Sequence, residues 1–209
     1  TPDYEVVRGQ PLPTGSRGHG VCYCDATERF YVGASYMDAV LMFDRDFKPC
    51  ETIQISEKVK QFNSPQHHCN DVAVYGESLF VSMFSATGNW KRDVFDGAVL
   101  EFNIHSGKRI GTVVSDLWMP HNVTFVDGGL VVLDSLRGNF LRNNMNVSGN
   151  FPGFTRGLAY DGNFFLIGQS RNRNYSKNIG LSKNISIDAS IIVFDDTTKI
   201  SRSLQLHPK

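Results

Sequence analysis

The sequence predicts an all-β fold, a small β-propeller of four-stranded antiparallel blades. The chain has 15 Phe, seven Tyr and 19 Gly, and stretches of helix-favouring residues are almost absent. A pair of apolar strands joined by a tight turn recurs four times, with first strands beginning near residues 20, 71, 122 and 157. Further strands follow in the same order, which is typical of blades arranged around a channel.

Each strand pair has an apolar first strand, a turn rich in Gly, Asp or Glu, and a β-branched or aromatic second strand. The four pairs cover residues 20–25 and 29–35, 71–76 and 78–83, 122–127 and 129–135, and 157–162 and 163–170. A flat β-sandwich also has short strands, but it does not explain the same strand order four times.

Third and fourth strands complete the repeats. Third strands of one pattern occupy residues 39–44, 98–103 and 190–195, and outer strands follow at 51–55, 109–114 and 200–206. In the third repeat these strands are shorter, and only residues 139–141 and 145–147 can form them. We therefore expect one propeller domain over 1–209, with repeats at about 17–60, 66–116, 119–150 and 154–207. Residues 4–9 read as one more outer strand, which would close the ring in the last blade or belong to a fifth.

Composition limits the function. The 21 Lys and Arg balance 21 Asp and Glu, which argues against a nucleic-acid partner or a charged membrane surface. The sequence contains no uninterrupted apolar run of about 18 residues, the length that a membrane-spanning helix needs. We expect a soluble protein, cytoplasmic rather than secreted. The cysteines have no zinc-binding spacing and are expected to be free thiols.

The repeat alignment places polar side chains in one ring. Inner strands of a propeller all begin at the same end of the channel, so residues at matching positions converge. The first position holds His19, Asn70, His121 and Arg156. One place later come Gly20, Asp71, Asn122 and Gly157, and two places earlier come Arg17, His68, Met119 and Phe154. Four of the six histidines lie in this ring or beside it.

Imidazole in such a ring suits proton transfer or metal ligation near neutral pH. For catalysis the candidates are His121 as base, Asp71 as its orienting partner and Arg156 as anion clamp. For ligand binding the sequence adds Arg17, His19, Asn70, Asn122 and Arg171. A divalent transition metal could be held by His19, His68, His121 and Asp71. The alternative is that the ring is only the solvated mouth of a channel.

Two further features are less specific. Ser35, Ser82, Asp134 and Gln169 share a position in the second strands, where they would form a second polar layer or face the next blade. Residues 170–178 predict either a solvated loop or a flap over the mouth. In the corresponding loop of the second blade, Trp90 could stack on a sugar ring.

Four segments of the second half resemble a bacterial propeller family of unknown function. They are the Met-Pro-His element at 119–121, the strand end at 133–135, the Gly-Phe-x-Arg-Gly-Leu element at 153–158, and the strand end at 167–171. The resemblance extends over about 117–195. It implies a propeller fold and draws attention to His121, Arg156 and Ser170. Members are associated with glycans and glycosyltransferases, which implies a carbohydrate-related role but no reaction.

The sequence therefore favours a propeller that binds a small polar ligand, anionic or saccharide-like, at the channel mouth. The first alternative is a non-catalytic scaffold that binds a protein partner along its rim. A lectin with one sugar site per blade ranks last, because Trp90 has no aromatic counterpart in every repeat.

Overall fold

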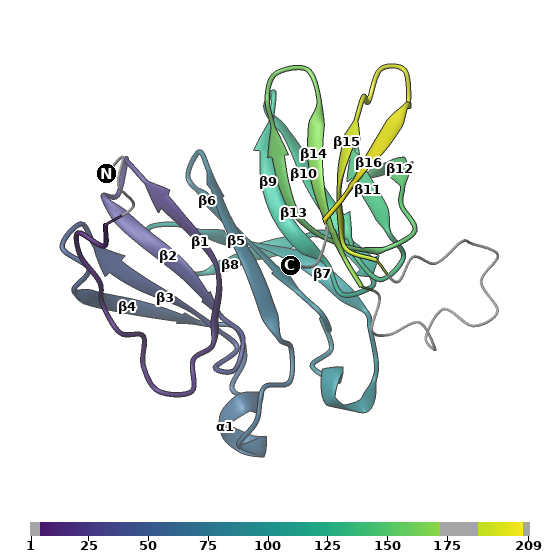
Figure 1. The fold of residues 1–209 in the computed structure, drawn as a ribbon. Coiled ribbons are helices and arrows are strands. Elements are labelled where there is room, and N and C mark those ends of the chain that lie inside the picture. The colour runs from purple at the N-terminus through teal and green to yellow at the C-terminus, as the bar shows by residue number, and fades with distance from the viewer. Residues whose placement is uncertain (1–4, 172–187, 207–209) are drawn as a thin grey trace.

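A computed structural model describes residues 5–171 and 188–206 (Figure 1). The described residues form four antiparallel sheets of four strands each, and each sheet takes its strands in chain order. The first two sheets contain β1 (Gly18–Cys24), β2 (Arg29–Ala34), β3 (Ala39–Asp44), β4 (Pro49–Gln54), β5 (Cys69–Tyr75), β6 (Ser78–Met83), β7 (Gly97–Asn103) and β8 (Arg109–Leu117). The other two contain β9 (His121–Val126), β10 (Gly129–Asp134), β11 (Asn139–Arg142), β12 (Asn146–Asn150), β13 (Phe154–Tyr160), β14 (Phe165–Ser170), β15 (Ser190–Phe194) and β16 (Ser201–Gln205). The predicted order of strands is confirmed.

The first strand of each sheet lies on the inside of the array. Along it, β1 contacts β5, β5 contacts β9, and β9 contacts β13. Apolar side chains between successive sheets form separate clusters, such as the one that contains Tyr31, Leu79 and Met83 between the first two sheets. Burying each such side chain stabilises the fold by about 1.5–3 kcal/mol. Packing between sheets therefore holds the inner strands side by side.

Two segments differ from the prediction. Residues 5–9 do not form a strand; they lie along the first sheet, where Arg8 pairs with Asp46 at 2.9 Å. Pro11 and Pro13 follow directly, and because proline has no N–H donor this segment is poorly suited to pair with a sheet edge. A short helix, α1 (Lys58–Phe62), stands between the first two sheets where none was predicted.

Buried polar side chains hold the segments that lead into the inner strands. Ser35 Oγ donates to the Arg17 carbonyl at 3.0 Å. In the other sheets the side chain accepts from the backbone: Ser82 from the Asp71 N–H at 3.1 Å, Asp134 from the Trp118 N–H at 2.6 Å, and Gln169 from the Gly153 N–H at 2.8 Å. The second polar position therefore fixes the inner strand of its own sheet.

Asp38 makes a stronger link, from the first sheet to the second. Its fully buried carboxylate accepts three backbone N–H bonds, from Gln66 at 2.5 Å, His67 at 3.0 Å and His68 at 2.7 Å. The backbone of His68 has φ 53°, a conformation that non-glycine residues rarely adopt. This carboxylate therefore sets the path of the chain just before β5.

We predict that Asp38→Ala destabilises the protein by about 3 kcal/mol or more, because three buried N–H groups lose their acceptor at once. Chemical denaturation measures the loss. Asp46→Ala, which removes an exposed carboxylate from the same sheet, is the control and should unfold like the wild type. A loss for Asp38→Ala no larger than that of the control would show that the link is dispensable.

Candidate functional site

Each inner strand is interrupted by a β-bulge close to its start. The pairing register shifts between Gly18 and Val21 in β1, between Cys69 and Asp71 in β5, and between Thr155 and Leu158 in β13. In the third sheet the shift lies opposite residues 122–123 of β9. Bulges turn side chains out of the regular alternation and are common beside functional sites. Here the bulges coincide with the predicted ring.

Residues at the first two of the aligned positions lie around one hollow. One hollow is lined by His19, Gly20, Asn70, Asp71, His121, Asn122 and Arg156. A pocket of about 170 Å³ adjoins it and shares three of those residues. Its lining is His19, His68, Phe84, Met119, His121, Phe154, Arg156, Ser170 and Arg171. Side chains from all four sheets and their lead-in segments therefore surround one space.

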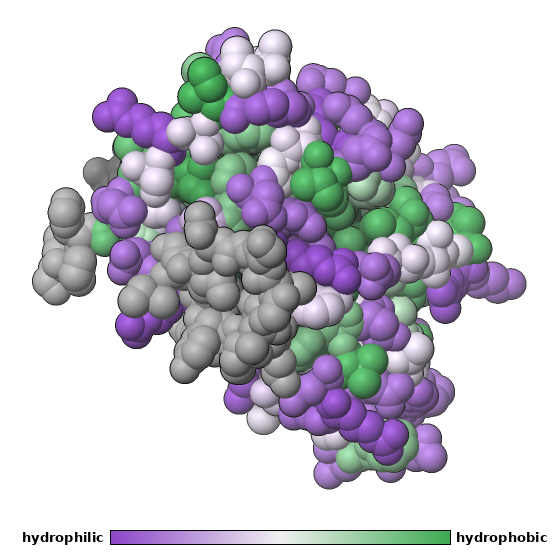
Figure 2. All heavy atoms as spheres, turned by 90° about the vertical axis from the view of Figure 1, so that its right-hand side faces the viewer, coloured by the Kyte–Doolittle hydropathy of each residue, from purple (hydrophilic) through white to green (hydrophobic). Residues whose placement is uncertain are grey.

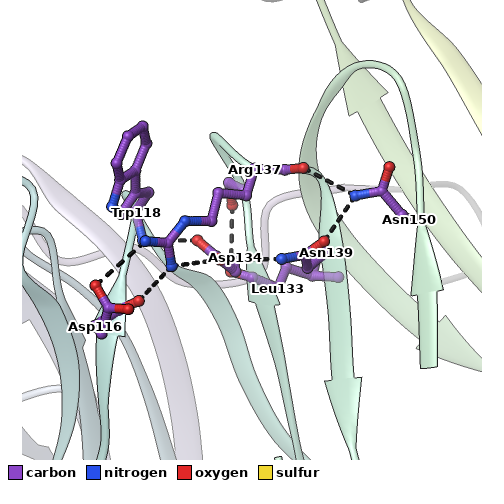
Figure 3. A network of polar contacts seen from close by, with 8 residues as sticks. Asp116, Trp118, Leu133, Asp134, Arg137, Asn139 and Asn150 are labelled. Carbon is purple, nitrogen blue, oxygen red and sulfur yellow. Dashed lines mark hydrogen bonds and ion pairs between the residues drawn. The ribbon is translucent and has the colours of Figure 1, made fainter. Parts of the chain in front are cut away.

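A polar network in the third sheet positions His121 (Figure 3). Asp134, at the end of β10, accepts the Trp118 N–H and also a bond from Arg137 at 3.3 Å. Arg137 reaches on to Asp116 and stacks its guanidinium 4.6 Å from the centre of the Trp118 ring. These contacts fix residues 116–120, so that β9 begins with His121 facing the pocket.

His121 is held in one tautomer. Its Nδ1 lies 2.9 Å from the Met119 carbonyl and 2.9 Å from Ser135 Oγ. A carbonyl only accepts, so Nδ1 carries the hydrogen and Nε2 keeps a lone pair. Nε2 lies 3.4 Å from a guanidinium nitrogen of Arg156. Burial, and then Arg156, lowers the pKa of His121 to about 3. This imidazole is therefore a neutral acceptor at pH 7.

His68 lies between two aromatic rings. Its ring centre is 4.3 Å from that of Phe84 and 4.3 Å from that of Trp90 in the 3₁₀ turn η1 (Trp90–Arg92). Burial lowers its pKa to about 3, and its Nδ1 has no hydrogen-bond partner. His19 lies 5.6 Å from His68 between ring centres, and burial followed by the charge of Arg156 lowers its pKa too. At neutral pH these imidazoles are uncharged.

The fixed charge in the pocket is positive. Arg156 and Arg171 line it, and none of the described residues in its lining is a carboxylate. Arg17 was expected in the same ring, but its guanidinium turns to Tyr36, where it donates to the phenol oxygen at 3.0 Å. It therefore lies beside the pocket and outside its lining.

Asp71 and Asn70 face neighbouring backbone. The Asp71 carboxylate accepts from the N–H of Val72 at 2.9 Å and of Val123 at 3.2 Å, which ties β5 to β9. It fills the space beside Gly20, where an added Cβ would lie 1.7 Å from its oxygen. Burial raises its pKa to about 6. Asn70 donates to the Pro120 carbonyl at 3.3 Å. Both side chains line the hollow, and their main role is to link β5 to the backbone of β9 and of the residues just before it.

The expected metal set does not assemble. Within residues 5–171 and 188–206, no group of three or more His, Cys, Asp or Glu is placed to hold a metal ion. Asp71 is committed to backbone N–H groups, and His68 is enclosed by Phe84 and Trp90. These donors therefore do not fit a divalent metal.

Some contributors were missed in the sequence. Phe84 forms the apolar wall with Met119 and Phe154, and Asp38 and Tyr36 support the site from the turn after β2. The signal for Asp38 was a lone carboxylate before the apolar run that forms β3. The predicted flap falls largely on residues 172–187, outside the described residues. All four cysteines are free, as expected.

The fold is that of a β-propeller, and the pocket lies where the inner strands of its four sheets begin. A family model matches residues 35–206, and the chain belongs to that family, a domain of unknown function called DUF4915. The Met-Pro-His and Gly-Phe-x-Arg-Gly-Leu elements are not themselves established as marks of it. No curated protein matches the sequence.

Several solved structures share the fold. A candidate gluconolactonase has a TM-score of 0.62 at 16% identity over 95% of this chain and 66% of its own. A protein of unknown function from Bacteroides caccae has a TM-score of 0.59 at 13% identity, over 98% of this chain and 66% of its own. A calcium-binding protein, regucalcin, from Agrobacterium tumefaciens strain C58 has a TM-score of 0.58 at 13% identity, over 88% of this chain and 58% of its own. This chain thus spans less than two thirds of these proteins, and at these identities the likeness establishes the fold alone.

Among the described residues, no helix is both long enough and apolar enough to cross a bilayer.

We predict that acid stabilises the fold through Asp71. Its folded-state pKa of about 6 lies above the ordinary value of 3.8, so its contribution is complete below about pH 4 and is lost as pH rises through 6. Relative to Asp71→Asn, the wild type should lose up to about 3 kcal/mol between pH 4 and 7. Urea unfolding of both proteins across this range measures the difference. A constant difference contradicts the prediction.

We also predict that His121 stays neutral from pH 5 to pH 8, since its pKa is lowered to about 3. Long-range ¹H–¹⁵N NMR should report hydrogen on Nδ1 and a lone pair on Nε2 throughout. In Arg156→Gln the pKa should rise, because a repelling charge is removed. A titration of wild-type His121 near pH 6.5 would refute the assignment.

Proposed function

We propose that the chain binds a small hydroxylated carboxylate, of the sugar-acid class, in the axial pocket. The observation that carries this proposal is the combination of fixed cations and neutral imidazoles in one lining without carboxylates. The Arg156 guanidinium would pair with the anionic group in bidentate fashion. Arg156 would then turn its N–H away from His121 Nε2, which lies 3.4 Å from it in the free protein, and the lone pair of Nε2 would accept a hydroxyl hydrogen.

The size and the walls of the pocket also favour a sugar acid. Its volume of about 170 Å³ lies below the ~300–1,000 Å³ that is usual for drug-sized ligands. Phe84, Met119 and Phe154 provide an apolar wall that suits the C–H face of a sugar. The candidate gluconolactonase with this fold gives independent reason to test such compounds.

Binding has more support than catalysis. A pKa of about 3 makes His121 a weak general base, and Asp71 bonds to backbone N–H groups. An anion paired with Arg156 would offset the charge that lowers the pKa of His121, so base catalysis in the bound state is a further proposal. A reaction would require the ligand to restore basicity at Nε2.

The protein-binding scaffold remains the second candidate and has less support. On the face shown in Figure 2, apolar side chains lie in small groups separated by polar ones. Large continuous apolar patches are the usual mark of a protein interface.

The test is calorimetric titration with D-gluconate and, as a neutral comparison, D-glucose. We expect saturable gluconate binding that Arg156→Gln weakens about tenfold or more, since a charge-assisted pair is lost. Arg109→Gln, an exposed arginine on β8, is the matched control and should bind like the wild type. If the wild type prefers glucose, or Arg156→Gln binds gluconate unchanged, the proposal fails.

A further inference from the structure

A second cationic cluster lies on the rim, beside the pocket. It consists of Arg17, Tyr36, Trp90 and Lys91, which come from the lead-in to β1, the turn after β2 and the turn η1. The arginine and the lysine are exposed, and the two aromatic rings are half-buried. The cluster is therefore open to a ligand while its rings are held in place. We call it the rim cluster.

Two positive charges converge on one ring in the rim cluster. The guanidinium carbon of Arg17 lies 4.0 Å from the centre of the Tyr36 ring, and Lys91 Nζ lies 5.7 Å from the same centre. Lys91 Nζ is also 4.6 Å from the Trp90 ring. No ion pair among the described residues includes Arg17 or Lys91. The two distances place the charges within about 10 Å of each other, so they repel each other, and a bound anion would relieve the repulsion.

His68 connects the rim cluster to the pocket. Its ring centre lies 6.3 Å from that of Tyr36 and 4.3 Å from that of Trp90, and the same side chain lines the pocket. It is only 8% exposed, and its Nδ1 has no partner. His68 therefore lies against both the rim cluster and the pocket, so the two sites share one side chain.

Charges from the pocket and from the rim cluster both act on the pocket histidines. The pKa of His19 is lowered, after burial, by Arg156 and then by Arg17. The pKa of His68 is lowered by Lys91 and Arg17 in addition to burial and His19. Arg156 and Arg171 belong to the pocket lining, and the rim cluster contacts the same lining through His68.

We propose that the ligand carries an anionic group at each end of a hydroxylated middle. One group would pair with Arg156, and the other would lie against the exposed charges of Arg17 and Lys91. This inference rests on the proposed function, which supplies the first anionic group. The second group is a carboxylate or a phosphate, because both chemistries pair with arginine and lysine.

The test compares D-gluconate, with one charged group, with D-glucarate and 6-phospho-D-gluconate, which differ from it by a second one. We expect at least one of these two compounds with two anionic groups to bind the wild type about tenfold more tightly than gluconate. Whichever binds more tightly identifies the second group as carboxylate or phosphate. In the double variant Arg17→Gln/Lys91→Gln this advantage should disappear, and gluconate affinity should change less than about twofold.

The matched control is Lys108→Gln/Arg109→Gln, which removes the same charges from the outer edge of the second sheet and should keep the advantage of the second anionic group. The inference is overturned if neither compound with two anionic groups binds the wild type more tightly than gluconate, or if the control variant loses as much of that advantage as the rim variant. Failure of the two proposals can be told apart. If gluconate binding depends on Arg156 but a second anionic group brings no advantage, the proposed function stands and the rim cluster is not part of the site. If binding needs Arg17 and Lys91 but is unaffected by Arg156→Gln, the proposed function and the contact with Arg156 both fail, and only an anion site at the rim cluster remains.

Discussion

The site depends on buried side chains that bind the backbone leading into the inner strands. Asp38 takes three N–H groups before β5, and Asp134 takes the Trp118 N–H before β9. Such N–H groups cannot be left without an acceptor once the sheets pack, because each would cost about 1–3 kcal/mol. The conformation that meets this requirement gives His68 and Met119 positive φ values of 53°. Pocket geometry thus follows from satisfying backbone donors in the core.

Electrostatics in the pocket follow from the same burial. Removing His68 and His121 from water disfavours their charged forms, and the nearby guanidinium of Arg156 disfavours that of His121 further. Three imidazoles therefore supply hydrogen bonds without adding charge, and the positive potential comes from arginine and lysine. In a sequence, a ring of histidines suggests metal or acid–base chemistry; in this structure the same histidines form an uncharged polar lining beside arginine side chains.

Much of the fold could be predicted because strand pairs recur in one order, and turn chemistry and alternating apolar residues mark each of them. The ring could be predicted because the repeats align, so that residues at equivalent positions begin each inner strand, and the structure adds a bulge at that point in all four sheets. Side-chain direction could not be predicted. Arg17 shares a repeat position with His68, yet its guanidinium turns to Tyr36, a partner 19 residues away. Asp71 bonds to the backbone of another sheet, and residues 5–9 lack a strand despite an apolar pattern. Such outcomes depend on tertiary neighbours that no local pattern reveals.

The bulges at the start of the inner strands have a consequence for how such a protein can change. His19 and Arg156 lie where the regular pairing is interrupted, and both are exposed. Main-chain atoms make the ladder of backbone bonds on either side of these two positions, whereas Asp71 in the bulge of β5 binds the backbone through its side chain. Positions 19 and 156 can therefore take other residues at less cost to stability than position 71, so that one scaffold can accommodate a succession of ligand chemistries.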